Sequence, residues 1–200
     1  MCWAYFLIIL TFVQAPKNEA IEPRTIQLHD CEFSTYIFEE VINARIVMLA
    51  EQLDKEYAGK QPLFLAVLNG SFMFVADLLK RITIPCEVSF IRLSSYQDTL
   101  STGRVKEVLG LNEDIQHRHV VVLEDIVDTG HTVHGLLEQL RERGPASVEV
   151  ATLLLKPDCL QHPLDIQYVA KSIPNDFVVG DGLDYNGLGR NLRDIYKIVP

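Results

Sequence analysis

Positive charge is scarce in this sequence, and several common site motifs are missing. The chain has 18 lysines and arginines against 27 aspartates and glutamates, a formal net charge of −9 and no basic run, which disfavours a nucleic-acid partner. No C-x-x-C pair occurs among the four cysteines, and the six histidines show no metal-ligand spacing. Both absences argue against a zinc site or a disulfide framework and favour reduced thiols. No G-x-x-x-x-G-K-[ST] string is present, which excludes a Walker-type nucleotide site.

The amino terminus is almost wholly apolar from Trp3 to Val13, but no lysine or arginine precedes this run. A secretory signal normally carries such basic residues, although Val13-Gln14-Ala15 resembles a signal-peptidase site. The run is also too short to cross a membrane comfortably. Two interpretations of residues 1–16 therefore stay open: a signal peptide, or an upstream extension attached to a cytosolic enzyme.

The alternation of strand-like and helix-like segments predicts a single α/β domain. With 200 residues, of which 48% are hydrophobic, the chain is sufficient for one core. The order of segments favours a doubly wound, mostly parallel sheet of about five strands. We expect strands at 63–68, 88–93, 120–123, 148–155 and 177–180, and helices from Ser34 or Thr35 to about Tyr57, from 72 to 80 and from 133 to 143.

The segment from Val120 to Thr132 is the most informative part of the chain. A continuous apolar run, typical of a strand buried on both faces, ends in Glu124 and Asp125. Two apolar residues separate this pair from Asp128, and the small loop Thr-Gly-His-Thr follows. A helix with one apolar face comes next. The carboxylates and the loop therefore lie at the carboxyl end of a strand, where open α/β sheets bind ligands.

This arrangement suits a sugar phosphate. Gly130 has no side chain, so the backbone can approach a ligand closely, and Thr129 and Thr132 offer hydroxyls. The loop amides lie at the positive end of the helix dipole, which favours a phosphate. Glu124 and Asp125 can accept hydrogen bonds from ribose hydroxyls or hold Mg²⁺. A solvated acidic loop is the plainer interpretation of Asp-Thr-Gly alone, but the full string is far more specific.

A long polar stretch, residues 94–110, has no core-forming pattern. Loops of this length in a compact domain are usually functional lids or disordered segments. We expect a flexible lid in this stretch, one that closes over the site and keeps water out.

The segment at 120–132 resembles the signature with which phosphoribosyltransferases bind 5-phosphoribosyl 1-pyrophosphate (PRPP). From about Ile26 onward, the chain is similar to the hypoxanthine and hypoxanthine-guanine branch of that family, which acts on 6-oxopurines. The resemblance implies transfer of the phosphoribosyl group from PRPP to N9 of hypoxanthine or guanine, with release of pyrophosphate. It also implies a type I phosphoribosyltransferase fold over residues 26–200, with a small hood made by the terminal segments. The blocks that carry it are Leu68 to Ser71, Ser95-Tyr96, Glu124 to Thr132, Lys156, Asp176 to Gly180, Asp184 to Asn186, and Arg190.

For the purine, the resemblance implies that Lys156 donates to the exocyclic O6. Phe177 stacks on one face of the base, and Ile126 lies against the other. The main chain at Val178 reads the base edge, and Asp184 belongs to the same site. Without the resemblance, Lys156 reads as a solvated strand-end lysine and Phe177, flanked by valines, as core.

Asp128 is the implied catalytic residue, placed near purine N7 or N9 as general base or proton acceptor. Mg²⁺ is the implied cofactor, with Asp184, Glu124 and Asp125 as candidate ligands. The guanidinium of Arg190 suits the oxygens of pyrophosphate. The full set implied to bind PRPP is Leu68, Asn69, Gly70, Ser95, Tyr96, Glu124, Asp125, Asp128, Thr129, Gly130, His131, Thr132 and Arg190.

Two residues depart from the family pattern. Asn69 stands where many relatives have lysine, and His131 stands in the phosphate loop where lysine is frequent. We expect the backbone cradle for the phosphates to survive both changes. The affinity for PRPP is expected to be altered or pH-dependent.

Two other functions stay open. One is a phosphoribosyltransferase for another base; Lys156 with Phe177 favours a 6-oxopurine over adenine but leaves xanthine possible. The other is a PRPP-sensing regulator without catalysis. Three observations disfavour it: the net charge of −9, the lack of a preceding helix-turn-helix segment, and the retention of Asp128 and Arg190.

The resemblance also implies small-molecule substrates without nucleic acid, and a homodimer or homotetramer. It implies a cytoplasmic enzyme, because PRPP is an intracellular metabolite.

Overall fold

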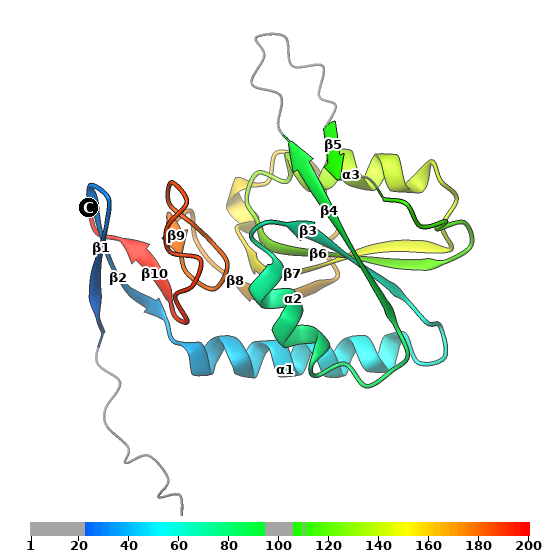
Figure 1. Cartoon of the computed structure of the whole chain (residues 1–200), viewed down its shortest axis with the longest axis horizontal. Helices are drawn as coiled ribbons and strands as arrows, with labels where there is room; N and C mark the ends of the chain where they lie inside the picture. Colours follow the sequence, from blue (N-terminus) through cyan, green and yellow to red (C-terminus); the bar gives the residue numbers. More distant parts are fainter. Residues whose placement is uncertain (1–22, 95–105, 110) are drawn as a thin grey trace, which may run out of the picture.

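A computed structural model describes residues 23–94, 106–109 and 111–200 (Figure 1). The apolar segment 1–16, most of the expected lid, and Ser95 and Tyr96 lie outside the described residues. Within the described part, the chain forms two sheets, one of six strands and one of four.

The larger sheet has the strand order β5-β4-β3-β6-β7-β8, and all neighbours are parallel except β4 and β5. This confirms the doubly wound, mostly parallel sheet. The expected fifth strand at 177–180 was wrong for this sheet, because β8 takes that edge. The short strand β5 lies inside the stretch expected to be a lid. The bounds are β3 Leu63–Leu68, β4 Glu87–Ser94, β5 Lys106–Leu109, β6 His119–Val127, β7 Ser147–Leu155 and β8 Tyr168–Ser172.

Helices cover both faces of this sheet, which explains why its central strands are continuous apolar runs. Helices α1 (Glu39–Glu56) and α2 (Phe72–Leu79) pack on one face, and α3 (His131–Arg141) packs on the other. Alternate residues of each strand point to opposite sides: Phe64 and Val121 join the α1/α2 core, whereas Leu65 and Val122 join the α3 core. The two cores hold the ends of β3, β6 and β7 in fixed register.

The expected start of the first helix at Ser34 or Thr35 was wrong. Both residues lie in strand β2 (Cys31–Ile37), and the helix begins at Glu39. Phe33 and Ile37 are buried at strand spacing, and β2 pairs on both sides. The backbone N–H of Glu39 donates to Asp194 Oδ1 at 2.8 Å, so a side chain 155 residues away satisfies an amide of the first turn. No local capping pattern could have revealed this start.

The smaller sheet is the expected hood, built from both ends of the described chain. Its order is β1-β2-β10-β9, with β1 at Thr25–Leu28, β9 at Val178–Val179 and β10 at Ile195–Ile198. β9 is thus a short antiparallel strand of the hood, with Val179 opposite Tyr196. Phe33, Val179 and Tyr196 form a separate small core. Among the described residues, no helix combines the length and apolarity needed to cross a membrane.

Candidate active site

Three neighbouring strands, β3, β6 and β7, end at one edge of the large sheet, and the residues there supply the site. β3 leads into a turn at Gly70, and β7 ends just before Lys156. β6 is longer than the sequence suggested. It runs to Val127, so Glu124 and Asp125 stand within the strand, with Glu124 opposite Thr152 of β7. The loop from Asp128 to Gly130 then connects β6 to α3.

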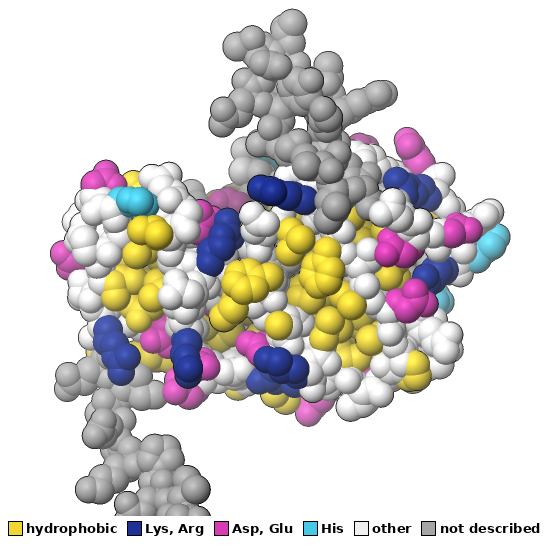
Figure 2. All heavy atoms as spheres, viewed as in Figure 1, with side chains coloured by type: hydrophobic (Ala, Val, Ile, Leu, Met, Phe, Trp, Pro, Cys, Tyr) yellow, Lys and Arg dark blue, Asp and Glu magenta, His cyan; other side chains and the backbone are white. Residues whose placement is uncertain are grey.

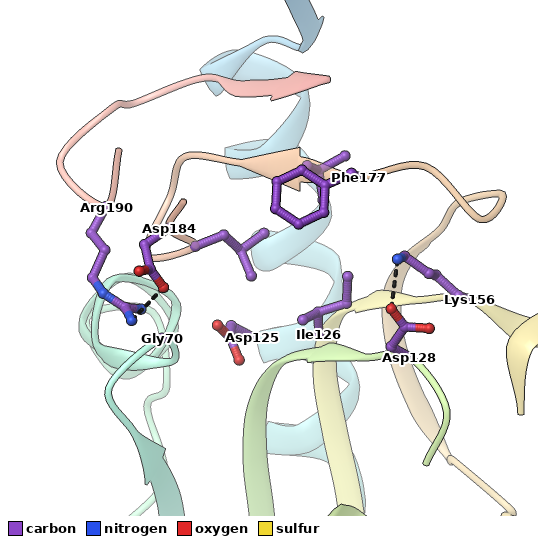
Figure 3. Close-up of a pocket in the computed structure, with 10 residues that line it drawn as sticks. Gly70, Asp125, Ile126, Asp128, Lys156, Phe177, Asp184 and Arg190 are labelled. Carbon is purple, nitrogen blue, oxygen red and sulfur yellow. Dashed lines mark hydrogen bonds and ion pairs between the residues drawn. The ribbon is translucent and has the colours of Figure 1, made fainter. Parts of the chain in front are cut away.

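A cavity of about 270 Å³ opens between this edge and the hood (Figure 3). The sequence had picked out all of its lining residues except Leu183. Leu183 is apolar and 7% exposed, so no chemical signal marked it within the site-forming tail. The lining consists of Gly70, Asp125, Ile126, Asp128, Lys156, Phe177, Val178, Leu183, Asp184 and Arg190.

On one side of the cavity, Lys156 donates from Nζ to Asp128 Oδ2 at 2.6 Å (Figure 3). The lysine is only 6% exposed, so the plain interpretation as a solvated strand-end residue was wrong. Its backbone N–H donates to the carbonyl of Val127 at 2.9 Å, which ties the end of β7 to the end of β6. A buried ammonium has three donors, and the bond to Asp128 uses one of them. This corner therefore offers a donor and a carboxylate acceptor side by side.

On the other side, Arg190 Nη2 pairs with Asp184 Oδ1 at 2.5 Å. Arg190 Nη1 also donates to the carbonyl of Gly182 at 2.6 Å, and Asp184 Oδ2 accepts the N–H of Gly187 at 2.7 Å. These bonds orient both charged groups toward the cavity (Figure 3). A cation and a carboxylate thus stand together at this side as well.

Phe177 and Ile126 lie above and below the space between the two ion pairs (Figure 3). Phe177 is 45% exposed, so it is not the core residue that its valine neighbours indicated. Tyr185 contacts its ring edge-on, with centroids 5.7 Å apart, and Phe33 lies at 6.2 Å. The hood therefore holds an aromatic ring opposite an aliphatic side chain, an arrangement that suits a flat ligand.

Glu124 and Asp125 are held in an environment that opposes their ionisation. Glu124 is 7% exposed, does not line the cavity, and its Oε2 has no hydrogen-bond partner within the described residues. Burial, and then the neighbouring Asp125, raises the pKa of Glu124 well above its usual value. Burial raises the pKa of Asp125 to about 6, against the lowering effect of backbone hydrogen bonds and Arg190.

Gly70 is needed because Asp125 lies against its backbone. A Cβ on Gly70 would stand 1.6 Å from Asp125 Oδ2. A Cβ on Gly182 would likewise stand 2.0 Å from the carbonyl oxygen of Gly70. The turn after β3 therefore packs against the side chain of Asp125 and against the backbone of the tail at Gly182. The preceding Leu68–Asn69 peptide bond is cis, and the Asn69 side chain is exposed.

The expected phosphate loop passes directly into α3. Gly130 precedes the helix with φ of 79°, a left-handed conformation that favours glycine, and its carbonyl accepts the N–H of His134. The first amides of a helix have no intrahelical acceptor, so those of the first turn are available to an anion. Thr129, His131 and Thr132 surround this end of the helix, and Asp128 links it to the cavity.

A family profile described as "Phosphoribosyl transferase domain" matches residues 39–186, more than half of the chain. The chain belongs to this phosphoribosyltransferase family. The match spans the expected phosphate loop, the acidic pair and Lys156, and reaches Asp184 in the tail.

Individual phosphoribosyltransferases match over most of the chain. A hypoxanthine-guanine phosphoribosyltransferase of Mycobacterium tuberculosis is 40% identical over 193 residues, covering 92% of this chain and 96% of that protein. One from Streptococcus pneumoniae is 44% identical over 145 residues, covering 72% and 81%. A solved structure of a hypoxanthine phosphoribosyltransferase from Staphylococcus aureus has 40% identity and a TM-score of 0.79, covering 83% of this chain and 91% of that one.

The donor set of this phosphoribosyltransferase fits a magnesium ion held jointly with a substrate. Asp125 and Asp184 present carboxylate oxygens to the cavity beside Arg190. Nowhere in the described parts of the chain do three or more His, Cys, Asp or Glu side chains gather so as to hold an ion by themselves. Mg²⁺ commonly takes one or two protein carboxylates and completes its shell with water and substrate phosphates. The site therefore fits the ion as part of a complex with PRPP.

Proposed function

We propose that the chain transfers the 5-phosphoribosyl group of PRPP to N9 of hypoxanthine and guanine, giving the nucleotide and pyrophosphate, as a purine salvage enzyme. The observation that carries this proposal is the pair of Lys156 and Asp128 beside the slot between Phe177 and Ile126. The adjacent O6 and N7 positions of a 6-oxopurine form one acceptor and, in the N7–H tautomer, one donor. A buried ammonium next to a carboxylate is complementary to that edge.

The same pair supports a role for Asp128 in proton handling. When N9 bonds to C1 of the ribose, the purine becomes cationic unless it loses the proton on N7. The carboxylate of Asp128 would take that proton, and Lys156, which donates to Asp128, would stabilise the negative charge that gathers on O6. In this proposal the main chain at Val178 reads the edge of the base, and Asp184 also belongs to the base site.

The rest of the site supports binding of PRPP. The 5′-phosphate would occupy the loop from Thr129 to Thr132, and the ribose hydroxyls would face Asp125 and Glu124. The pyrophosphate would lie between Arg190 and the turn at Gly70. When bound, Mg²⁺ would neutralise charge that develops on the pyrophosphate as its bond to C1 breaks. Asp184 could hold that ion once Arg190 turned from this carboxylate to the pyrophosphate.

The test is incubation of the purified protein with PRPP, Mg²⁺ and one of four bases, followed by measurement of nucleotide. We expect product with hypoxanthine and guanine, none without Mg²⁺, and none with adenine. The amino group of adenine would meet the ammonium of Lys156 donor to donor, at a cost of roughly 1–3 kcal/mol or more. Efficient use of adenine would overturn the proposal. Binding of PRPP without turnover of any base would favour a regulator, and xanthine turnover would widen the specificity.

We also propose that residues 26–200 form the phosphoribosyltransferase domain of a cytoplasmic enzyme that works as a homodimer or homotetramer. Hydrophobic side chains gather over α2 and β4 on the face shown in Figure 2. Phe72, Val88 and Phe90 are 41%, 43% and 38% exposed there, a grouping typical of a subunit contact. Light scattering on the purified protein should give a molar mass that is a multiple of 22.7 kDa. Phe90→Lys should lower this mass toward that of the monomer. A monomer at all concentrations would contradict this assembly.

A further inference from the structure

Three histidines gather beside the phosphate loop: His131 and His134 of α3, and His162 from a segment 31 residues further along the chain than His131. His131, the first residue of α3, contacts His162 of the segment between β7 and β8, with Nδ1 and Nε2 2.6 Å apart. His134, one turn along α3, stacks on His162 with ring centroids 4.3 Å apart and planes inclined by 6°. The other ring nitrogen of His131, Nε2, lies 2.7 Å from Gln161 Oε1.

The partners of His131 select where a proton resides. Gln161 Oε1 accepts only, so Nε2 of His131 carries a hydrogen. In the neutral ring, Nδ1 of His131 then accepts from His162. If the cluster gains a proton, His131 becomes an imidazolium that donates on one side to Gln161 and on the other to His162. Gln161 and His162 can both accept from that form, so each N–H of a charged His131 would have an acceptor.

Several titratable and charged groups surround the histidine cluster. Desolvation and the imidazoles of His134 and His131 lower the pKa of His162. Glu138 lies 3.5 Å from His134 at the far end of the cluster. On the loop and the following segment, Asp128 and Lys156 neutralise each other in their ion pair, and Asp158 and Asp165 are exposed on the segment that carries His162.

The segment that carries His162 is fixed to the phosphate loop. The N–H of Gln161 donates to the carbonyl of Thr129 at 2.9 Å. A Cβ on Gly130 would meet Leu164 Cδ1 at 2.6 Å, so the same segment also packs directly on the glycine of the loop. A change at His162 is therefore transmitted to the loop through His131 and the backbone.

We propose that His162 is a positioning residue that holds a proton on His131 and thereby sets the affinity of the phosphate loop for the 5′-phosphate of PRPP; this rests on the proposed function for the identity of the ligand. An imidazolium at the N-terminus of α3 is repelled by the helix dipole until a phosphate dianion lies over the first turn. Phosphate binding and proton uptake at His131 are then linked, so affinity is greatest at low pH and falls as pH rises.

The expected effect is moderate because the site is open to solvent. One charge within a helical turn of a dianion should change the affinity on the order of three- to tenfold. We expect the KM for PRPP to rise by that factor between about pH 6 and about pH 8.5, the range in which imidazoles titrate. The ionisation of the ligand's own phosphate also contributes to this rise in KM. His131→Gln should remove the remaining part. His162→Gln should shift the rise to lower pH, while kcat changes by less than about twofold.

The matched control is His117→Asn, because His117 is exposed before β6, at the opposite end of that strand. A second measurement avoids turnover: calorimetry of ribose 5-phosphate binding in two buffers of different ionisation enthalpy counts the protons taken up. Wild type and His117→Asn should take up protons near pH 7, and His131→Gln should not. Identical KM profiles and proton uptake in wild type and His131→Gln would overturn the inference. Failure of every base to react would overturn only the proposed function, because ribose 5-phosphate binding would still report on His131.

Discussion

Ionisation of Asp181 should lower the free energy of unfolding as pH rises. Asp181→Asn should abolish this loss of stability. The residue is 4% exposed, and its Oδ2 accepts no hydrogen bond from any described residue. Burial, and then the charges of Asp77, Glu39 and Asp125, raises the pKa of Asp181 from 3.8 to about 7. It lies in the tail that carries Asp184 and Arg190 but does not line the cavity.

The sign and size of the effect follow from the pKa. Because the folded-state pKa is raised, the folded protein holds this proton over a pH range in which the unfolded chain has already lost it. Stability is therefore unaffected below the ordinary pKa of 3.8 and falls as pH rises toward about 7. A shift of this size corresponds to roughly 4 kcal/mol at most, since one pKa unit equals about 1.4 kcal/mol. Asparagine keeps the shape and carries no charge.

The assay is urea denaturation at about pH 5 and about pH 8 on wild type, Asp181→Asn and the exposed control Asp165→Asn. We expect Asp181→Asn to exceed wild type by about 2–4 kcal/mol at the higher pH and by less at the lower one. Asp125 interacts with Asp181 through its charge, so the difference reports the titration of Asp181 together with this interaction. An equal difference at both pH values, or a variant less stable than wild type at about pH 8, would refute the reasoning.

Three further substitutions test the site. Asp128→Asn should lower kcat by about 10²–10⁴-fold and leave the KM for PRPP nearly unchanged, because the group handles a proton in the transition state; an unchanged kcat with a raised KM would instead make Asp128 a ligand-holding residue. Phe177→Leu should raise the KM for hypoxanthine about two- to tenfold through lost stacking, and a larger change in the KM for PRPP would speak against that role. Gly70→Ala should lower kcat/KM on the order of 10²-fold, because its Cβ would fall 1.6 Å from Asp125 Oδ2 and displace that carboxylate. Kinetics indistinguishable from wild type would show that Asp125 need not hold its position.

Local patterns in the sequence determined much of the fold and most of the site. The strand at Val120–Leu123 and the helix after Gly130 each depend on neighbours in the chain, and both exist, although β6 runs on to Val127 and α3 begins at His131. The cavity-lining residues were recognised almost completely because the family resemblance added those that local patterns did not mark, among them Lys156, Phe177 and Arg190. The spacing of apolar residues predicts, however, only that one face of a helix or strand is buried. It does not identify the element that packs on that face.

Only the tertiary structure decided the features that depend on partners distant in sequence. The first helix begins at Glu39 because β2 pairs with β10 and Asp194 caps the helix, and neither contact has a local signal. Likewise, the hood turns Phe177 from a core residue into one wall of a cavity. The sequence by itself determined which residues carry chemistry. The packing of β6 beside β7 decided that Lys156 meets Asp128 and that His131 meets His162, because adjacent parallel strands bring the ends of separate segments together.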